Sequence, residues 1–285
     1  MIAAPFDYAT PATLAEAVAL LTEHQDDAKL LAGGHSLIPA MKLRLAMPQM
    51  LIDLGRISDL AYIREDGDTI AIGAMTTHYQ LESSARLQEI CPMIPECAGQ
   101  IGDVQVRNRG TLGGSLAHSD PAADWTAAMI AVNAEIVTAS ANGERIIKVD
   151  DFFVDLLTTA LEANEILREI RIQRPQGNFG QAYRKAAQPA SGFAVVGVAA
   201  YIVRDANGNC ESASIGVTGV ASKAYRATAV ESALAGKALD EATIVEAASH
   251  AADGVDINGD LYASSDYRTH LVKVYARRAI EAAIA

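Results

Sequence analysis

The chain has 285 residues, half of them hydrophobic, and a formal net charge of −12 at pH 7. This length predicts two or three subdomains rather than one core, and the acidic balance disfavours nucleic acid as a partner because it repels phosphate backbones. The longest apolar run, Phe193 to Val203, is too short for a membrane span, which takes roughly 20 residues. The N-terminus has no signal-peptide pattern, so the cytoplasm is the expected compartment.

A short α/β unit is predicted at the N-terminus. A helix is expected from about Thr13, because Thr13 and Glu16 have the spacing of a capping box and apolar residues then recur on one helical face. Lys29–Ala32 and Met50–Leu54 are short apolar runs typical of buried strands. These elements define a first subdomain, residues 1–55.

The hydrophobic pattern changes near residue 56, where a second subdomain, residues 56–176, is predicted to begin. Its expected strands and helices lie at 69–73, 134–139, 145–149 and 166–172, and near 78–87, 93–102 and from Pro121 onward. Asn142–Gly143 separates two of these strands. It predicts a tight hairpin, because both residues tolerate positive φ.

A third subdomain, residues 177–285, follows the linker-like segment Arg174–Gly177. Two β-rich runs, 193–203 and 210–220, are joined by a polar turn, and the remainder is predicted to be helical. The chain is therefore expected to be an α+β protein that ends in a sheet followed by helices. No internal repeat or low-complexity tail interrupts it.

Two glycine pairs are the most informative features of the sequence. Ala32–Ser36 and Thr111–Ser115 each combine Gly-Gly with hydroxyl side chains, and both are predicted to adjoin a strand. A backbone without Cβ atoms approaches an anion closely, and its N–H groups then donate to phosphate oxygens. Two such loops around one diphosphate would let an acidic protein hold a dinucleotide. An ordinary turn or strand bulge is the alternative for either pair alone.

Neither segment matches the Rossmann fingerprint or the P-loop pattern. Instead, Leu31–Pro39 followed by Met41–Arg44 resembles the first FAD-binding motif of the flavin subunits of molybdenum hydroxylases, the xanthine dehydrogenase and carbon monoxide dehydrogenase type. Gly110–Ser115 resembles their second motif, with Thr111–Leu112 in place of the commoner Thr-Ile. Shorter resemblances follow in the family's order over almost the whole chain, at Pro5–Tyr8, Ile72–Thr77, Asp120–Asp124, Glu165–Leu167 and Tyr183–Lys185.

The resemblance implies the FAD-binding fold of the vanillyl-alcohol oxidase and molybdopterin dehydrogenase type. Two α/β subdomains would hold the extended cofactor, and the C-terminal sheet-and-helix domain would close over the flavin ring. By matched position, the implied cofactor contacts are Leu31, Ala32, Gly33, Gly34, His35, Ser36, Leu37, Ile101, Thr111, Leu112, Gly113, Gly114, Ser115, Asp124, Leu167, Lys185 and Phe193.

The resemblance also implies a role for each group of contacts. The two glycine segments would contact the diphosphate and the ribityl chain, and Asp124 would accept a hydrogen bond from a cofactor hydroxyl. Ile101 and Leu167 would pack on the cofactor. Phe193 would cover one face of the flavin ring, a role that aromatic stacking suits.

Some of these residues have ordinary structural alternatives. Asp124 could stabilise the start of the predicted helix, Phe193 could pack in the core, and Lys185, which matches a basic position before the flavin loop, could be a solvated lysine. His35 is expected to contact the cofactor through its backbone. Residues 186–191 lack the basic pair that relatives carry there, so no charge role is assigned to this loop.

No metal site and no catalytic acid, base or nucleophile is expected within the chain. The remaining histidines have no metal-ligand spacing: His24, His78, His118, His250 and His270. Three cysteines are present, without a Cys-x-x-Cys pair: Cys91, Cys97 and Cys210. They predict neither a disulfide framework nor an iron–sulfur or zinc site.

In the family that the chain resembles, such a subunit takes electrons from [2Fe–2S] clusters of a small partner subunit into FAD and passes them to NAD⁺, a quinone, a cytochrome or O₂. The substrate is oxidised in a large molybdenum–pterin subunit, and the resemblance implies a dimer of heterotrimers. Two alternatives are a self-contained FAD oxidase or dehydrogenase of the same superfold and a non-enzymatic module that binds an anionic ligand. The first needs a substrate cavity over the flavin, and the second predicts no yellow chromophore.

Overall fold

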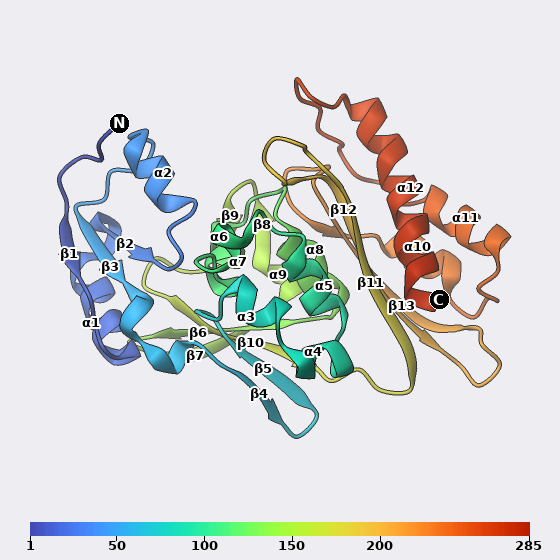
Figure 1. Ribbon diagram of the computed structural model, residues 1–285, viewed down its shortest axis with the longest axis horizontal. Coiled ribbons are helices and arrows are strands. Elements are labelled where there is room, and N and C mark those ends of the chain that lie inside the picture. Colours follow the sequence, from blue (N-terminus) through green and yellow to red (C-terminus); the bar gives the residue numbers. More distant parts are fainter.

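The computed structural model describes residues 1–285 and arranges them around three larger sheets that follow one another along the chain, with a small two-stranded sheet, β8-β9, beside them (Figure 1). The strands are β1 (Asp7–Ala9), β2 (Ala28–Leu31), β3 (Met50–Asp53), β4 (Ile63–Asp66), β5 (Thr69–Gly73), β6 (Glu135–Ser140), β7 (Gly143–Lys148), β8 (Phe153–Asp155), β9 (Thr158–Thr159), β10 (Ile166–Gln173), β11 (Asn178–Ala187), β12 (Ala194–Arg204), β13 (Cys210–Thr218) and β14 (Tyr225–Arg226). The α-helices are α1 (Leu14–His24), α2 (Leu37–Lys42), α3 (His78–Glu82), α4 (Ala85–Ile90), α5 (Met93–Gly99), α6 (Val104–Arg107), α7 (Leu112–His118), α8 (Asp124–Ala131), α9 (Val149–Phe152), α10 (Thr228–Leu234), α11 (Glu241–Ser249) and α12 (Ser265–Ile284). The predicted mixed fold of helices and sheets is confirmed.

The first sheet is parallel, in the order β1-β3-β2, and α1 packs against it. The expected start of α1 is confirmed, because the Thr13 hydroxyl accepts from the backbone N–H of Glu16 at 3.2 Å. The Glu16 carboxylate accepts from the N–H of Ala12 at 2.8 Å, one residue before the position that a capping box uses. Strand β1 and helix α2 were not predicted, because they are too short for a periodic pattern to show.

The second sheet is antiparallel, in the order β4-β5-β10-β6-β7, and its core joins it to α5, α7 and α8. The hairpin at Asn142–Gly143 is confirmed, with Ser140 paired to Gly143 and Gly143 at a φ of +111°. The predicted helix over 78–87 is two helices, since the chain turns at Ser83 and Ser84 caps α4. Helix α8 begins at Asp124 rather than Pro121.

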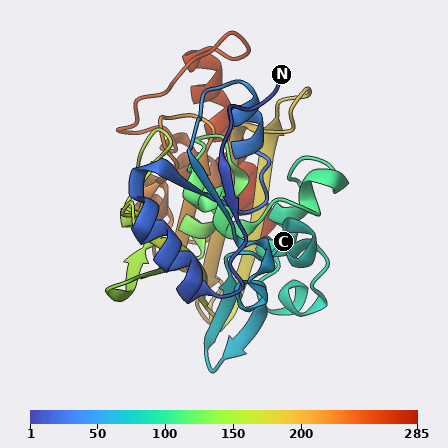
Figure 2. The same ribbon diagram turned by 90° about the vertical axis from the view of Figure 1, so that its left-hand side faces the viewer.

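The third sheet is antiparallel, in the order β11-β12-β13-β14. Helices α10 and α12 cover its outer face, α11 packs on these two helices, and α5 and α8 contact its inner face. Strand β11 was not predicted. Its mixture of small, polar and charged residues is more typical of a loop than of a buried strand. Figure 2 shows the first sheet in front and the long third sheet behind the helices between them.

The first two sheets and the third lie on either side of the central helices (Figure 1). The core of this layer contains residues of the second and third predicted subdomains, and the first subdomain reaches it through Gly33, which adjoins Arg109 and Gly110. The predicted subdomain boundaries fall in the turn Leu54–Arg56 and between β10 and β11, and they stay a prediction. No helix is both long and apolar enough to cross a membrane.

Candidate functional site

The two glycine segments, far apart in the sequence, touch each other in the fold. A Cβ added to Gly33 would lie 2.3 Å from the carbonyl oxygen of Arg109 and 2.8 Å from the Cα of Gly110. A Cβ added to Gly114 would lie 3.2 Å from the Cβ of Ala32. No larger residue fits at Gly33 without moving one of the two backbones, so the contact between the segments depends on this glycine.

The first segment is a tight loop between β2 and α2, as expected of a segment that follows a strand. Gly34 adopts a φ of +80°, a conformation that side chains other than glycine rarely adopt. The backbone N–H groups from Gly33 to Ser36 donate to no acceptor in the protein, and the loop is half-buried or exposed. Consecutive unpaired N–H groups form the kind of concavity that binds an anion.

The second segment is the first turn of a helix, so the prediction that it adjoins a strand is wrong. Thr111 is the N-cap of α7, and its hydroxyl accepts from the N–H of Gly114 at 3.1 Å. Gly113 packs against Ala74, because its N–H donates to the Ala74 carbonyl at 2.9 Å and an added Cβ would lie 2.5 Å from the Ala74 Cβ. Only an isolated bridge from Thr111 to Thr77 has strand character.

His78 lies beneath the junction of the two segments, at the start of α3. Its side chain is 4% exposed, and its Nδ1 accepts a hydrogen bond from Trp125 Nε1 at 3.0 Å. Because Trp125 only donates, this bond leaves the ring proton on Nε2 in the neutral form. Burial, reinforced by the charges of His35 and Arg107, lowers the pKa of His78 from 6.5 to about 4, so the ring is neutral near pH 7.

The buried neutral His78 makes the stability of the FAD-free chain depend on pH. The unfolded chain takes up a proton below its ordinary pKa of 6.5 and the folded chain only near 4, so stability is full above 6.5 and falls as pH drops toward 4. We expect wild type to lose about 1 kcal/mol more than His78→Asn between about pH 7 and about pH 5.5. Urea unfolding at both pH values measures the difference, and equal losses in the two proteins would contradict it.

Asp124 and Lys185 form a buried ion pair, and both side chains are 5% exposed. Lys185 Nζ donates to Asp124 at 3.0 Å, to the carbonyl of Gln100 at 2.7 Å and to the carbonyl of Gly192 at 2.7 Å. The Tyr183 hydroxyl donates to the other Asp124 oxygen. Burial raises the pKa of the Asp124 carboxyl, and the Lys185 ammonium opposes that rise. These bonds tie together α5, α8, β11 and the loop before β12.

The remaining expected contacts lie around this layer. Leu167 is buried in β10, and Ile101, which follows α5, is half-buried against the same core. Phe193 directly follows the loop that Lys185 holds and is 46% exposed, so it does not pack in the core. Lys185 is buried rather than solvated, and Asp124 does stand at the start of α8. Whether each of these residues contacts the cofactor stays a prediction.

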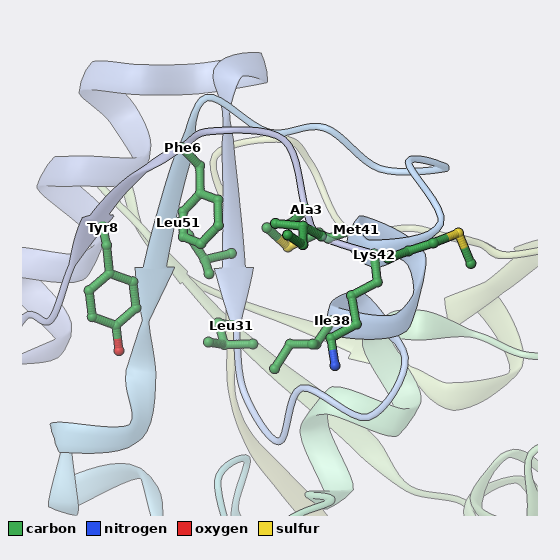
Figure 3. Close-up of a pocket in the computed structure, with 10 residues that line it drawn as sticks. Ala3, Phe6, Tyr8, Leu31, Ile38, Met41, Lys42 and Leu51 are labelled. Carbon is green, nitrogen blue, oxygen red and sulfur yellow. The ribbon is translucent and has the colours of Figure 1, made fainter.

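An apolar pocket of about 520 Å³ lies beside the first glycine segment, between α2 and the first sheet (Figure 3). Leu31 and Ile38, which flank the glycine loop, contribute to its wall. It is lined by Met1, Ile2, Ala3, Phe6, Tyr8, Leu31, Ile38, Met41, Lys42 and Leu51. Apart from Lys42 its lining is hydrophobic, and the Tyr8 hydroxyl is already bonded to Asp53. The pocket therefore suits an apolar group, and the glycine loop, with its unpaired N–H groups, is the better anion site.

Comparison with known proteins agrees with this geometry over the whole chain. Residues 4–175 match the family model described as the FAD binding domain in molybdopterin dehydrogenase, and residues 181–283 match the CO dehydrogenase flavoprotein C-terminal domain. The chain is 42% identical to the carbon monoxide dehydrogenase medium chain of Hydrogenophaga pseudoflava, over 99% of this chain and 98% of that one.

Solved structures show the same similarity. Carbon monoxide dehydrogenase from Hydrogenophaga pseudoflava superposes with a TM-score of 0.96 at 43% identity, covering 99% of this chain and 98% of that chain. Quinoline 2-oxidoreductase from Pseudomonas putida 86 superposes with a TM-score of 0.93 at 33% identity, covering 100% and 98%.

The fold, the two glycine segments and the matching family models together identify this chain as an FAD-containing oxidoreductase subunit. The chain belongs to the family of FAD-binding medium subunits of molybdenum hydroxylases, which includes the carbon monoxide dehydrogenase medium chains. The predicted family, cofactor and enzyme class are confirmed, and the reading as a non-enzymatic module is set aside.

Two residues that lie at the centre of this region, His78 and Tyr183, were not predicted from the sequence. His78 was considered only as a metal ligand, although it directly follows Ile72–Thr77, a stretch that resembles the family. Tyr183 was included only as part of a matching stretch, although its hydroxyl bonds to Asp124. Neither role has a local pattern, because each partner lies on a distant segment of the chain.

Proposed function

We propose that this chain is the electron-transfer subunit of a heteromeric molybdenum hydroxylase, in which it links the [2Fe–2S] clusters of a small partner subunit to an external electron acceptor. A large molybdenum–pterin subunit would oxidise the substrate. The family relationship supports this role, since the matched relatives are medium chains of dehydrogenases. FAD, when bound, supplies the redox chemistry, and the protein supplies binding, orientation and electrostatics.

The observation that carries the proposal is the contact between the two glycine segments. The unpaired N–H groups of Gly33–Ser36 open toward solvent beside the turn that begins at Thr111. These donors fit the diphosphate of FAD without a cluster of cations, in keeping with the net charge of −12. Gly33 to Ser36 would hold the diphosphate, with Thr111 to Ser115 on its other side.

The C-terminal domain would shape the flavin end of the site. Phe193 exposes an aromatic ring that suits stacking on a flavin face. Lys185 fixes the loop before it by bonding the Gly192 carbonyl, so Phe193 would be held in place before the cofactor binds. In this arrangement FAD lies between the subdomains 1–55 and 56–176, and the domain 177–285 closes over its ring.

The finer parts of the proposal concern partners. The chain holds no group of three or more His, Cys, Asp or Glu side chains placed to bind a metal, and its three cysteines are buried free thiols. The proposed complex is a dimer of heterotrimers, whose mass light scattering would measure. The acceptor is one of NAD⁺, a quinone, a cytochrome or O₂, and direct assays with each would identify it.

Electron transfer is tested most directly without knowing the substrate. The small iron–sulfur subunit is reduced with dithionite, desalted and mixed anaerobically with the FAD-loaded chain. We expect the flavin absorbance bands to bleach while the cluster is reoxidised, as followed by electron paramagnetic resonance. Flavin that stays oxidised in this mixture, although dithionite alone reduces it, would overturn the proposed role.

A matched control uses the Gly33→Ala chain, which is expected to bind FAD about 100-fold more weakly and is desalted so that it carries little FAD. Mixed with the same reduced subunit, it should leave the cluster reduced, because the electron acceptor is missing. Reoxidation at the wild-type rate in this control would show that the cluster loses its electrons elsewhere.

A further inference from the structure

Besides the backbone N–H groups of the glycine loop, one side-chain donor in the site has no partner in the protein. The side chain of His78 is 4% exposed, and its Nδ1 accepts from Trp125 Nε1 at 3.0 Å, which places the ring proton on Nε2. No side chain or carbonyl of the chain accepts a hydrogen bond from that Nε2–H. This nitrogen is not one of the fully buried side-chain atoms that lack a partner, so it reaches the space beside the ring. A histidine that serves only the core normally has both ring nitrogens satisfied by the protein.

The unpartnered edge of the ring faces the place where the two glycine segments meet. A Cβ added to Gly110 would lie 2.6 Å from His78 Nε2 and 2.8 Å from its Cδ2. Gly110 in turn contacts Gly33, and its carbonyl accepts from the backbone N–H of His78 at 2.9 Å. Because Gly110 has no side chain, it leaves Nε2 of His78 uncovered. The small space beside Nε2 therefore exists only while residue 110 is glycine.

We propose that the Nε2–H of His78 donates a hydrogen bond to a diphosphate oxygen of bound FAD. The Trp125 bond would act as a positioning contact, because it sets both the orientation of the ring and the nitrogen that carries the proton. This inference rests on FAD binding, which the family shows, and not on the proposed electron-transfer role. It adds a side-chain donor from α3 to the backbone donors of the two glycine segments.

The neutral state of the ring suits this task. A charged imidazolium at the junction would lose hydration that the surrounding core does not replace, whereas a neutral ring costs less to bury while the site is empty. The contact would therefore contribute a directional hydrogen bond rather than a charge. Loss of a hydrogen bond to a charged group corresponds to roughly 10- to 100-fold weaker binding.

Two variants distinguish the contributions of the two ring nitrogens to FAD binding. In His78→Asn, the amide oxygen replaces Nδ1 and still accepts from Trp125, but no donor remains at the Nε2 position. In His78→Gln, the longer amide places an N–H near the Nε2 position and loses the Trp125 acceptor. The FAD dissociation constant is measured on the complex assembled with each full-length chain, by ultrafiltration and fluorescence of released FAD, and thermal unfolding of each chain reports its folding.

We expect His78→Asn to weaken FAD binding about 10- to 100-fold and His78→Gln to retain binding within about 5-fold of wild type. FAD binding that is unchanged in His78→Asn, or equally weakened in both variants, would overturn the proposal, because the Nε2 donor would then have no specific part. A structure of the wild-type complex with FAD bound decides the matter even if a variant does not fold. Nε2 should lie within about 3.2 Å of a diphosphate oxygen, and a separation above about 4 Å would refute the contact.

Discussion

Replacing Lys185 by methionine is expected to lower the free energy of unfolding by about 3–5 kcal/mol, since it leaves the Asp124 carboxyl buried and without its cation. The variant also leaves the carbonyls of Gln100 and Gly192 without their donor. Urea unfolding of the FAD-free chain measures the change. Because the loop that ends at Gly192 loses its anchor, we also expect faster proteolysis there.

Lys237→Met is the matched control for this prediction. Lys237 forms an exposed pair with Glu246 at 3.9 Å, and its loss is expected to cost no more than about 1 kcal/mol. Adding Asp124→Asn to Lys185→Met should restore part of the lost stability, because the buried charge disappears while an oxygen remains to accept from Tyr183. Equal losses from Lys185→Met and Lys237→Met would show that the buried pair contributes no more than a surface pair.

Replacing Gly33 by alanine is expected to weaken FAD binding about 100-fold. The new Cβ would meet the Arg109 carbonyl oxygen at 2.3 Å and the Gly110 Cα at 2.8 Å, and neither backbone atom can rotate away as a side chain would. The two glycine segments must therefore separate, which costs packing energy of about 1–3 kcal/mol and misplaces the donors around the diphosphate. The dissociation constant of FAD from the assembled complex measures the effect.

Gly99→Ala introduces the same methyl group where there is room for it. Its Cβ would lie 3.5 Å from the nearest atom, a carboxylate oxygen of Glu82, and alanine favours the helix α5 that contains this position. We expect FAD binding within about 2-fold of wild type and equal or greater stability. If Gly33→Ala binds FAD as well as Gly99→Ala does, the contact between the segments does not shape the cofactor site.

The sequence was sufficient for features that depend on local pattern. Hydrophobic periodicity and the Thr13 cap predicted α1, and Asn142–Gly143 predicted the hairpin of β6 and β7. The two glycine motifs identified the family and hence FAD, since both are contiguous strings of residues. Short or irregular elements could not be predicted in this way. Strand β1 has three residues and β11 carries mixed side chains, so neither has a periodic signal.

By itself, the sequence determined which family the chain belongs to and which cofactor it binds, and it predicted which short segments serve that cofactor. Only the tertiary structure decided how these segments combine. It showed that Gly33 touches Gly110, that Lys185 is the buried partner of Asp124, and that Trp125 sets the proton on His78. The physical reason is that each of these relations joins atoms from distant parts of the chain, and burial and hydrogen-bond partners exist only once the layers have packed.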